Sequence, residues 1–177
     1  MEDLSLHILD IVENSVAAKA DKIKINITED IKKDLLSVEI KDNGRGMDEV
    51  TKKQVLDPFY TTKTVRQFGL GLPLLSEAAK VANGHLSIQS KKGEGTRIKA
   101  NFQHSHIDRR PLGDIAQTIL IIVIGNPEID LIFVFKKNGF KYSLDTRKIR
   151  VQLMETPLNS PAGIRKIRED LKKLNFL

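Results

Sequence analysis

The sequence predicts a domain of mixed α and β structure, and three observations lead to this fold class. Apolar residues recur at helical spacing near the N-terminus and again over 71–81. Between these segments and after them, apolar and polar residues alternate, as in strands that are buried on one side. Hydrophobic residues make up 40% and charged residues 29% of the 177 residues, which suits one folded domain with an appendage.

The first part of the chain is expected to alternate between helices and strands. Leu4, Ile8 and Ile11 give the first helix an apolar face. Asp48 is a good N-cap for a short helix, and Asn83-Gly84 ends a longer one. The expected elements are a helix over 3–20, strands over 22–30 and 35–42, a short helix from about 48, a helix over 71–81 and a hairpin over 85–102.

The last part of the chain predicts a second, smaller group of elements. Residues 113–124 fit either a very apolar strand, which their isoleucines favour, or a helix closed by Gly125; we expect the helix because of its length. A hairpin should turn at Asn138-Gly139. A final helix is expected with Ser160 as N-cap and Pro161 at its first position.

Composition excludes several classes of protein. Without cysteine, neither disulfides nor thiolate metal sites form. Met1 leads directly into an acidic amphipathic segment, which is unlike a signal peptide. The longest apolar run, "TILIIVI", is too short to span a bilayer. We therefore expect a cytoplasmic protein without a membrane segment.

The net charge of +6 raises the question of an anionic partner. Most positive charges are lysines scattered among acidic residues, so a solvated surface is the favoured explanation. A nucleotide or an acidic protein partner comes next. Nucleic acid comes last, because no aromatic residues interleave with the basic ones to form a stacking surface.

Two polar residues stand on one face of the first helix. Asp10 and Asn14 are four residues apart and therefore point the same way. This face is either exposed to solvent or lines a site that needs polar oxygens. An Asn oxygen suits Mg²⁺, which prefers few protein ligands together with phosphate oxygens.

Two glycine-containing motifs follow. In "DNGRGM", Asp42 ends a strand and can accept a hydrogen bond from an exocyclic amine, while Gly44 and Gly46 allow a ring to approach the backbone. A plain turn explains that motif equally well. In "FGLGL", Gly69 and Gly71 open a helix whose free N–H groups suit a polyphosphate, although capping and tight packing also explain them.

Taken together and in this order, the motifs resemble the GHKL ATPase superfamily, which includes histidine kinases, DNA gyrase, mismatch-repair and heat-shock ATPases, and anti-sigma kinases. "ILDIVENS" is similar to the N box, "DNGRGM" to the first glycine box and "DPFYTTK" to the F box. "GLGL" is similar to the second glycine box and "GEGT" to the last. The resemblance covers roughly residues 3–103 and is strongest to histidine kinases.

The resemblance implies a Bergerat fold, a two-layer α/β (α+β) sandwich in which helices cover a mixed sheet and ATP lies between them. Asp42 would recognise adenine, Thr96 would support it, and Asn14 would bind Mg²⁺. Lys63 and Arg66 lie in the segment corresponding to the ATP lid. The residues implied in ATP binding are Asn14, Asp42, Gly44, Gly46, Met47, Lys63, Arg66, Gly69, Leu70, Gly71, Leu72 and Thr96.

The sequence departs from the superfamily at several positions. Asp10, the implied catalytic residue, stands where ATP-hydrolysing branches commonly have Glu, and it is one methylene shorter. Because a displacement of about 1 Å can cost on the order of 100-fold in rate, we expect slow intrinsic hydrolysis. Ala17 replaces a charged residue, and Phe68 a small one, which puts phosphate positioning in question.

The chain is expected to comprise an ATPase domain over 1–105 and a C-terminal α+β extension over 106–177. Because the N box stands at the start, we expect no dimerisation and phosphoacceptor region. His7 fits a packed residue better than a phosphoacceptor. His104 and His106 are phosphoacceptors, half a metal site or, as we favour, parts of a structural junction.

Two functions follow as hypotheses. The first is a stand-alone or signalling-subunit kinase, of histidine or serine type, which binds ATP and Mg²⁺ and phosphorylates a separate protein. The second is a non-enzymatic switch, in which ATP or ADP binding is reported to a partner by the extension. The sequence is compatible with a homodimer, and regulation through nucleic acid is the least favoured hypothesis.

Overall fold

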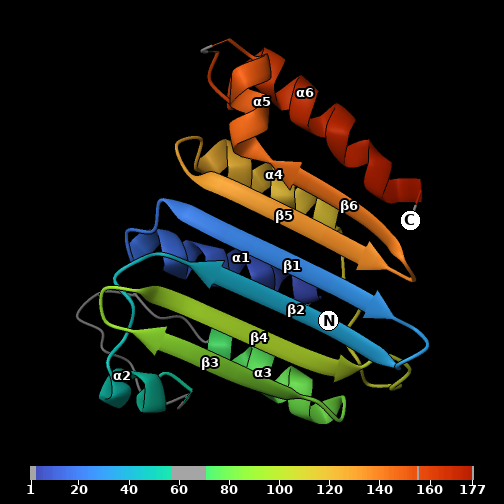
Figure 1. Cartoon of the computed structure of the whole chain (residues 1–177). Helices are drawn as coiled ribbons and strands as arrows, with labels where there is room; N and C mark the ends of the chain where they lie inside the picture. The colour runs from blue at the N-terminus through green and yellow to red at the C-terminus, as the bar shows by residue number, and fades with distance from the viewer. Residues whose placement is uncertain (1–2, 57–70, 155, 177) are drawn as a thin grey trace.

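The computed structural model describes residues 3–56, 71–154 and 156–176 (Figure 1). The helices are α1 (Leu4–Ala17), α2 (Glu49–Gln54), α3 (Gly71–Val81), α4 (Ile115–Gly125), α5 (Thr146–Gln152), α6 (Pro161–Leu171) and the 3₁₀ helix η1 (Lys172–Phe176). The strands are β1 (Lys22–Asp30), β2 (Leu35–Asp42), β3 (His85–Lys91), β4 (Gly95–Gln103), β5 (Asp130–Lys137) and β6 (Phe140–Asp145).

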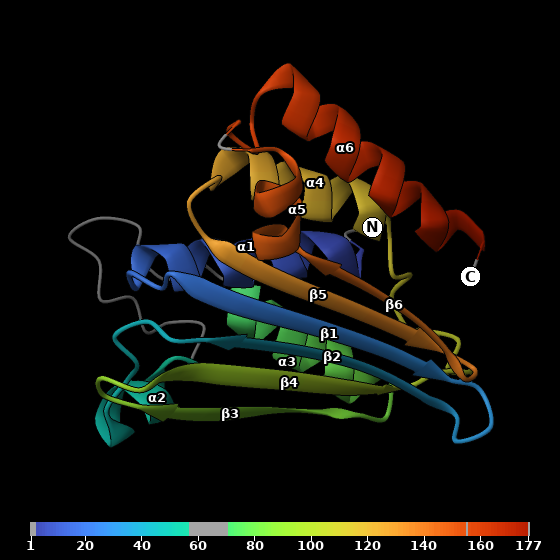
Figure 2. The ribbon, with the colours of Figure 1, turned by 45° about the horizontal axis from the view of Figure 1, so that its top comes forward.

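Within these residues the strands form one six-stranded sheet in the order β3-β4-β2-β1-β5-β6. Helices α1, α3 and α4 lie side by side on one face of this sheet, and α6 packs on α4 (Figures 1 and 2). Neighbouring strands are antiparallel except β1 and β5, which are parallel. The predicted α+β sandwich with a mixed sheet is therefore confirmed.

The core lies between the sheet and the helices. Ile23, Ile25 and Ile27 alternate along β1 and are completely buried, as expected for a strand with one covered face. Leu4 and Ile8 of α1 pack against them within the same buried cluster. Asp3 begins this helix as N-cap, and its side chain accepts a hydrogen bond from the backbone of the first turn.

The C-terminal part of the chain continues the same sheet. Ile25 of β1 lies opposite Ile40 of β2 on one side and opposite Phe133 of β5 on the other. Phe133 is completely buried, and its ring lies 6.0 Å from that of Tyr142 on β6. The N-terminal and C-terminal parts of the chain thus share one hydrophobic core.

Most of the expected C-terminal elements are confirmed. The segment over 113–124 is indeed helical, as α4, with Asp114 as its N-cap. Its residues are apolar nearly all round because it is packed between the sheet, α1 and α6. The hairpin turns at Asn138-Gly139, and Ser160 caps α6. Helix α5 was not expected from the sequence, since its N-cap Asp145 is also the last residue of a strand.

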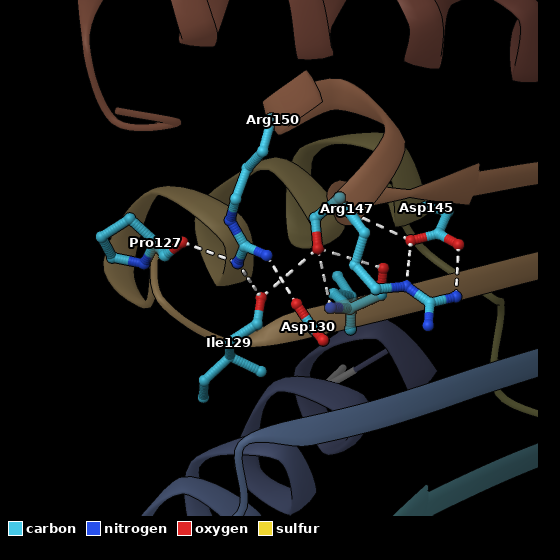
Figure 3. Close-up of polar contacts among 8 residues, drawn as sticks. Pro127, Ile129, Asp130, Asp145, Arg147 and Arg150 are labelled. Atoms are coloured by element: carbon cyan, nitrogen blue, oxygen red, sulfur yellow. Dashed lines mark hydrogen bonds and ion pairs between the residues drawn. The ribbon is translucent and has the colours of Figure 1, made fainter. Parts of the chain in front are cut away.

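Polar contacts fasten α5 to the start of β5 (Figure 3). Arg150 forms an ion pair with Asp130 at 2.5 Å and donates to the carbonyl oxygens of Pro127, at 2.9 Å, and Ile129, at 2.7 Å. Thr146 is fully buried, and its hydroxyl oxygen accepts a hydrogen bond from the backbone of β5. The guanidinium of Arg150 thus provides hydrogen-bond donors for the carbonyl oxygens of Pro127 and Ile129, where the chain enters β5.

The start of α1 is tied to the segment that leads into α4. The backbone N–H of Leu4 donates to the carbonyl oxygen of Pro111 at 2.9 Å. His7 is buried, and its Nε2 lies 3.1 Å from a guanidinium nitrogen of Arg110. Because guanidinium nitrogens only donate, His7 Nε2 is the acceptor in this contact. The expectation that His7 is a packed residue agrees with this position.

Among the described residues, each helix is too short, too polar or both to cross a bilayer.

Removal of the Phe133 ring tests the shared core. We expect Phe133→Ala to lower the free energy of unfolding by about 3–5 kcal/mol, because a large buried ring is replaced by a cavity. Ile132→Ala, on the other face of the same strand, should cost less because Ile132 is only partly buried. Urea unfolding followed by circular dichroism measures both variants.

The same experiment tests the predicted boundary at 105/106. A single transition, shifted as a whole by Phe133→Ala, is expected if the sheet unfolds as one unit. Two transitions, of which only one shifts, would instead mean that residues 106–177 form a domain that folds separately.

Candidate functional site

The site is organised by a buried carboxylate at the end of β2. Asp42 is 6% exposed. Its Oδ1 accepts hydrogen bonds from the backbone N–H of Gly44, at 2.9 Å, and of Thr96, at 3.2 Å. Its Oδ2 accepts a hydrogen bond from the hydroxyl of Ser15 at 2.8 Å. Such partners offset the large cost of burying a charged group.

The alternation of β2 aims this carboxylate at the helices. Val38, Ile40 and Asp42 face the core, because side chains two residues apart share one face of a strand. The pattern that buries the two apolar residues thus carries Asp42 into the space beneath α1. Its position at the last residue of the strand leaves it at the rim of the core, where a ligand can reach it.

Ser15 is a site residue that sequence reasoning missed. It lies on the apolar face of the first helix, where it is buried. Its hydroxyl oxygen also lies 3.2 Å from the carbonyl oxygen of Ile11, one turn earlier. A buried serine on an apolar helix face needs a hydrogen-bond partner. That requirement was the signal in the sequence, and Asp42 meets it.

Two glycines let the backbone pack tightly around the end of β2. Gly46 has a φ of +64°, and a Cβ at this position would lie 2.0 Å from the carbonyl oxygen of Lys91. Gly95 has a φ of +92°, and its Cβ would lie 2.1 Å from the carbonyl oxygen of Asp42. Only glycine fits both the backbone conformation and the space. These glycines therefore close the β3–β4 turn onto the loop after β2.

A second polar network joins this loop to the hairpin. The hydroxyl of Ser90 lies 2.9 Å from the hydroxyl of Thr96 and 2.9 Å from the carbonyl oxygen of Gly95. Its oxygen also accepts a hydrogen bond from the backbone N–H of Met47 at 2.8 Å. Thr96 therefore contacts Asp42 through its backbone and Met47 indirectly through Ser90, so it supports two walls of the site.

A cavity of about 40 Å³ lies against the carboxylate, between α1, the loop after β2 and α3. Its walls combine apolar side chains with a few polar groups, which is typical of small-molecule sites. Six of the residues predicted from the sequence line it, namely Asn14, Asp42, Gly46, Met47, Leu72 and Thr96. The other lining residues are Ile11, Ser15, Ala18, Arg45, Val55 and Ile98.

The predicted polar pair on α1 lies between this cavity and α3. Asn14 is partly buried in the cavity wall, and within the described residues no hydrogen bond engages its side-chain amide. Asp10 is exposed one turn earlier, beside the start of α3. A Cβ at Gly71 would lie 3.1 Å from Asp10 Oδ2, so glycine allows the first turn of α3 to approach this carboxylate.

Of the other predicted binding residues, the described ones, Gly44 and Gly71, are not among those that line the cavity. Gly44 is buried behind it, where a Cβ would lie 2.8 Å from the carbonyl oxygen of Ala18. Lys63, Arg66, Gly69 and Leu70 lie outside the described residues, as does the whole "DPFYTTK" motif. In the described ranges, no three His, Cys, Asp or Glu side chains gather as a metal-binding cluster.

This geometry suits a ligand with a flat, partly apolar group and an anionic tail. The carboxylate of Asp42 accepts hydrogen bonds from a donor group that enters the cavity. The first turn of α3 has backbone N–H groups, at Gly71 and Leu72, that have no partner within the helix, and it carries the positive end of the helix dipole, which favours an anion. Asn14 lies between these two features and offers a neutral oxygen.

Comparison with known families gives one match that covers most of the chain. A family described as "Histidine kinase-, DNA gyrase B-, and HSP90-like ATPase" matches residues 2–106. This range contains every residue that lines the cavity.

Curated relatives match the same region. The chain is 35% identical over 99 residues to Sensor histidine kinase YxdK of Bacillus subtilis, which covers 52% of this chain and 30% of that protein. It is 34% identical over 90 residues to Sporulation kinase C of Bacillus subtilis, covering 50% of this chain and 20% of that protein. The chain thus spans less than a third of the length of these relatives.

A solved structure resembles nearly the whole chain. The N-terminal domain of a DNA repair protein superposes with a TM-score of 0.57 at 19% sequence identity, over 85% of this chain and 56% of that one. At this identity the likeness concerns the fold. Because it covers 85% of the chain, it extends beyond the region that the family match includes.

Gly95 and Gly93 form a matched pair for testing the packing around Asp42. Both have positive φ, +92° and +83°, but a Cβ at Gly93 would meet nothing within 4 Å. Gly93→Ala should therefore cost only the conformational strain, about 1–2 kcal/mol of unfolding free energy. Gly95→Ala adds the clash with the Asp42 carbonyl, and we expect at least about 2 kcal/mol more. Denaturant unfolding gives the difference, and equal losses would contradict the close packing.

Proposed function

Since the chain belongs to the family of histidine kinase-, DNA gyrase B- and HSP90-like ATPases, we propose that it binds ATP with Mg²⁺ and transfers the γ-phosphate to a separate protein. The observation that carries the proposal is the buried Asp42, held by three hydrogen bonds in the wall of the cavity. The sheet with helices on one face is the Bergerat fold of this family.

We assign adenine to the cavity beside Asp42. Oδ1 already accepts two backbone hydrogen bonds, whereas Oδ2 accepts one, from Ser15. A carboxylate oxygen accepts about two hydrogen bonds, so Oδ2 retains capacity for the exocyclic amine of the base. Met47 and Leu72 would cover the faces of the ring, and the flexible Met47 side chain suits a wall that must adapt.

The phosphates would then run from the cavity toward the start of α3. The first backbone N–H groups of this helix point at them, with the helix dipole adding attraction. Asn14 fits as a ligand of Mg²⁺, since its amide is not engaged by a hydrogen bond within the described residues and it lines the same cavity. Bound there, Mg²⁺ would neutralise phosphate charge.

Asp10 is the proposed catalytic residue. It lies one turn before Asn14 on α1 and beside Gly71, so it stands at the phosphate end of the proposed ATP position. Asp is one methylene shorter than the Glu that is common at this position in ATP-hydrolysing branches. Asp10 would therefore hold an attacking water poorly, which keeps hydrolysis slow. An acceptor side chain of another protein would instead be positioned by the contacts between the two proteins. Asp10 therefore favours transfer of the phosphate to a histidine or serine of a protein over its release into water.

A non-enzymatic switch is the second candidate, and one observation favours it. Helix α1 lines the cavity with Asn14 and Ser15, and its other end is bonded to the segment before α4 through Leu4 and Pro111. A shift of α1 on nucleotide binding would therefore be passed to residues 106–177. In this case the ATP-bound and ADP-bound forms of the protein would bind a partner with different affinity, and no phosphate would be transferred.

Asp42→Asn tests the adenine assignment. The amide oxygen can keep the bonds from Gly44 and Thr96, and the hydroxyl of Ser15 can accept from the amide nitrogen, so the fold should be retained. The amide nitrogen would then face the amine of adenine, donor against donor. We expect ATP affinity to fall by on the order of 100-fold, as when a charged hydrogen bond is lost.

Asp108→Asn, an exposed substitution outside the site, is the control and should leave the ATP affinity unchanged. Calorimetry with Mg·ATP and Mg·ADP measures the affinity of the wild type, of Asp42→Asn and of this control. If the wild type binds neither nucleotide, or if Asp42→Asn binds ATP as tightly as the wild type does, the proposed site is wrong.

Substitutions at Asp10 test the catalytic assignment. Asp10→Ala should retain ATP binding but lose transfer of label from γ-labelled ATP to protein in an extract of the source cells. Asp10→Glu should raise phosphate release by about 10- to 100-fold, since the longer side chain reaches the water better. Glu13→Ala, exposed on the same helix, is the control and should behave as wild type. Absence of label transfer by the wild type would favour the switch.

A further inference from the structure

The face of the sheet opposite the helices is polar and positively charged. Figure 1 shows α1, α3 and α4 behind the strands, and among the described elements no helix covers the near face of the central strands. Residues out of phase with the buried ones point to this side. The residues of this open face are Lys22, Lys24, Asn26, Thr28, Asp30, Leu35, Ser37, Glu39, Lys41, His85, Ser87, Gln89, Lys91, Gly95, Arg97, Lys99, Asn101, Gln103, Asp130, Ile132, Val134, Lys136, Lys141, Ser143 and Asp145. The three aspartates lie at the ends of their strands and form ion pairs with Lys33, Arg150 and Arg147.

Three cations stand side by side across the middle strands of the open face. Lys24 of β1 lies directly opposite Lys41 of β2, which lies directly opposite Arg97 of β4. We call these three residues the cation row. Farther along the sheet, Lys136 and Lys141 also face each other. Like charges directly opposite on neighbouring strands destabilise a sheet, so folding alone does not favour this arrangement.

The acidic groups nearby do not neutralise the lysines. Glu39 forms an ion pair with Arg97 at 2.6 Å and accepts from Asn26 at 3.1 Å. Burial raises the pKa of Glu39, but the hydrogen bonds from Arg97 and Asn26 outweigh it and lower the pKa, so this carboxylate stays charged. Within the described residues, Lys24 and Lys41 take part in no ion pair.

A cleft of about 340 Å³ opens beside the cation row. It is lined by the cations Lys41, Lys91 and Arg97, by the acidic Asp42 and Glu94, and by Gln89, Ser90, Gly95 and Thr96. Asp42 is buried and its carboxylate accepts hydrogen bonds on the helix side of the sheet. Of these cations, Lys91 is paired with Glu94 and Arg97 with Glu39, which leaves Lys41 as the unpaired charge. A carboxylate entering the cleft would meet this ammonium and the amide donor of Gln89.

We propose that the open face is a docking surface for an acidic segment of a partner protein, whose carboxylates lie along the cation row. Charge complementarity is the main argument, since an acidic segment would relieve the repulsion between the lysines. The cation row faces the opposite side of the sheet from the nucleotide cavity, although the cleft beside it shares Asp42 and Thr96 with that cavity. The proposal does not depend on the proposed ATP chemistry.

Two other occupants fit the open face less well. Its described residues include no Phe, Tyr or Trp on which nucleic acid bases could stack, and Glu39 at its centre would repel a phosphate backbone. A second copy of the chain, related by a two-fold axis, would place the lysines of one copy against the same lysines of the other.

A labelled polyglutamate peptide serves as the probe, with binding followed by fluorescence anisotropy on the full chain at low ionic strength. The double variant Lys24→Gln/Lys41→Gln should bind it about tenfold more weakly or worse. Lys32→Gln/Arg165→Gln removes the same charge from exposed positions outside the open face and is the matched control, expected to bind as wild type. Added salt should weaken binding in the wild type.

The unfolding midpoint separates binding from folding. It should be unchanged or raised in Lys24→Gln/Lys41→Gln, because like charges are removed; if it falls, Lys24→Gln alone is compared instead. The proposal is overturned if polyglutamate does not bind, if the control loses as much affinity as the double variant, or if single-stranded or duplex DNA binds more tightly than polyglutamate through the same lysines.

Discussion

The arrangement of the site depends on one buried charge. The carboxylate of Asp42 receives hydrogen bonds from α1, from the loop after β2 and from the start of β4. If the carboxylate were removed, the backbone N–H groups of Gly44 and Thr96 would lose their acceptor, and the hydroxyl of Ser15 would keep only the carbonyl oxygen of Ile11. The carboxylate proposed to bind the ligand therefore also joins the helix layer to the sheet. This explains why the loop around it is built so tightly from glycines.

The sequence predicted the parts of the site that local chemistry reveals. Asp42 stood out because a carboxylate ended a strand before two glycines, and Asn14 because it shared a helix face with Asp10. Ser15 was missed because a small polar residue is tolerated on an apolar helix face and shows no partner in sequence. The network of Ser90 with Met47 and Thr96 was missed for a similar reason, since its members come together only when the hairpin folds back.

Strand neighbours were harder to predict than strands. The alternation in β1 and the Asn138-Gly139 turn after β5 identified both as strands, yet nothing local shows that they pair in parallel across about 100 intervening residues. That pairing joins the two parts of the chain that the sequence separated at residue 105. Helix α5 escaped notice because its N-cap, Asp145, was already counted as the end of a strand.

The position of β5 has a consequence for solubility during folding. In the region that matches the family, β1 would be the outermost strand, with a row of isoleucines behind it and an open ladder of backbone groups. Such an edge invites pairing with other chains. Residues 106–177 cover it and move the margin of the sheet to β6, a shorter strand that carries lysine. The C-terminal part thus leaves the sheet with an outer strand that is less suited to pairing with other chains.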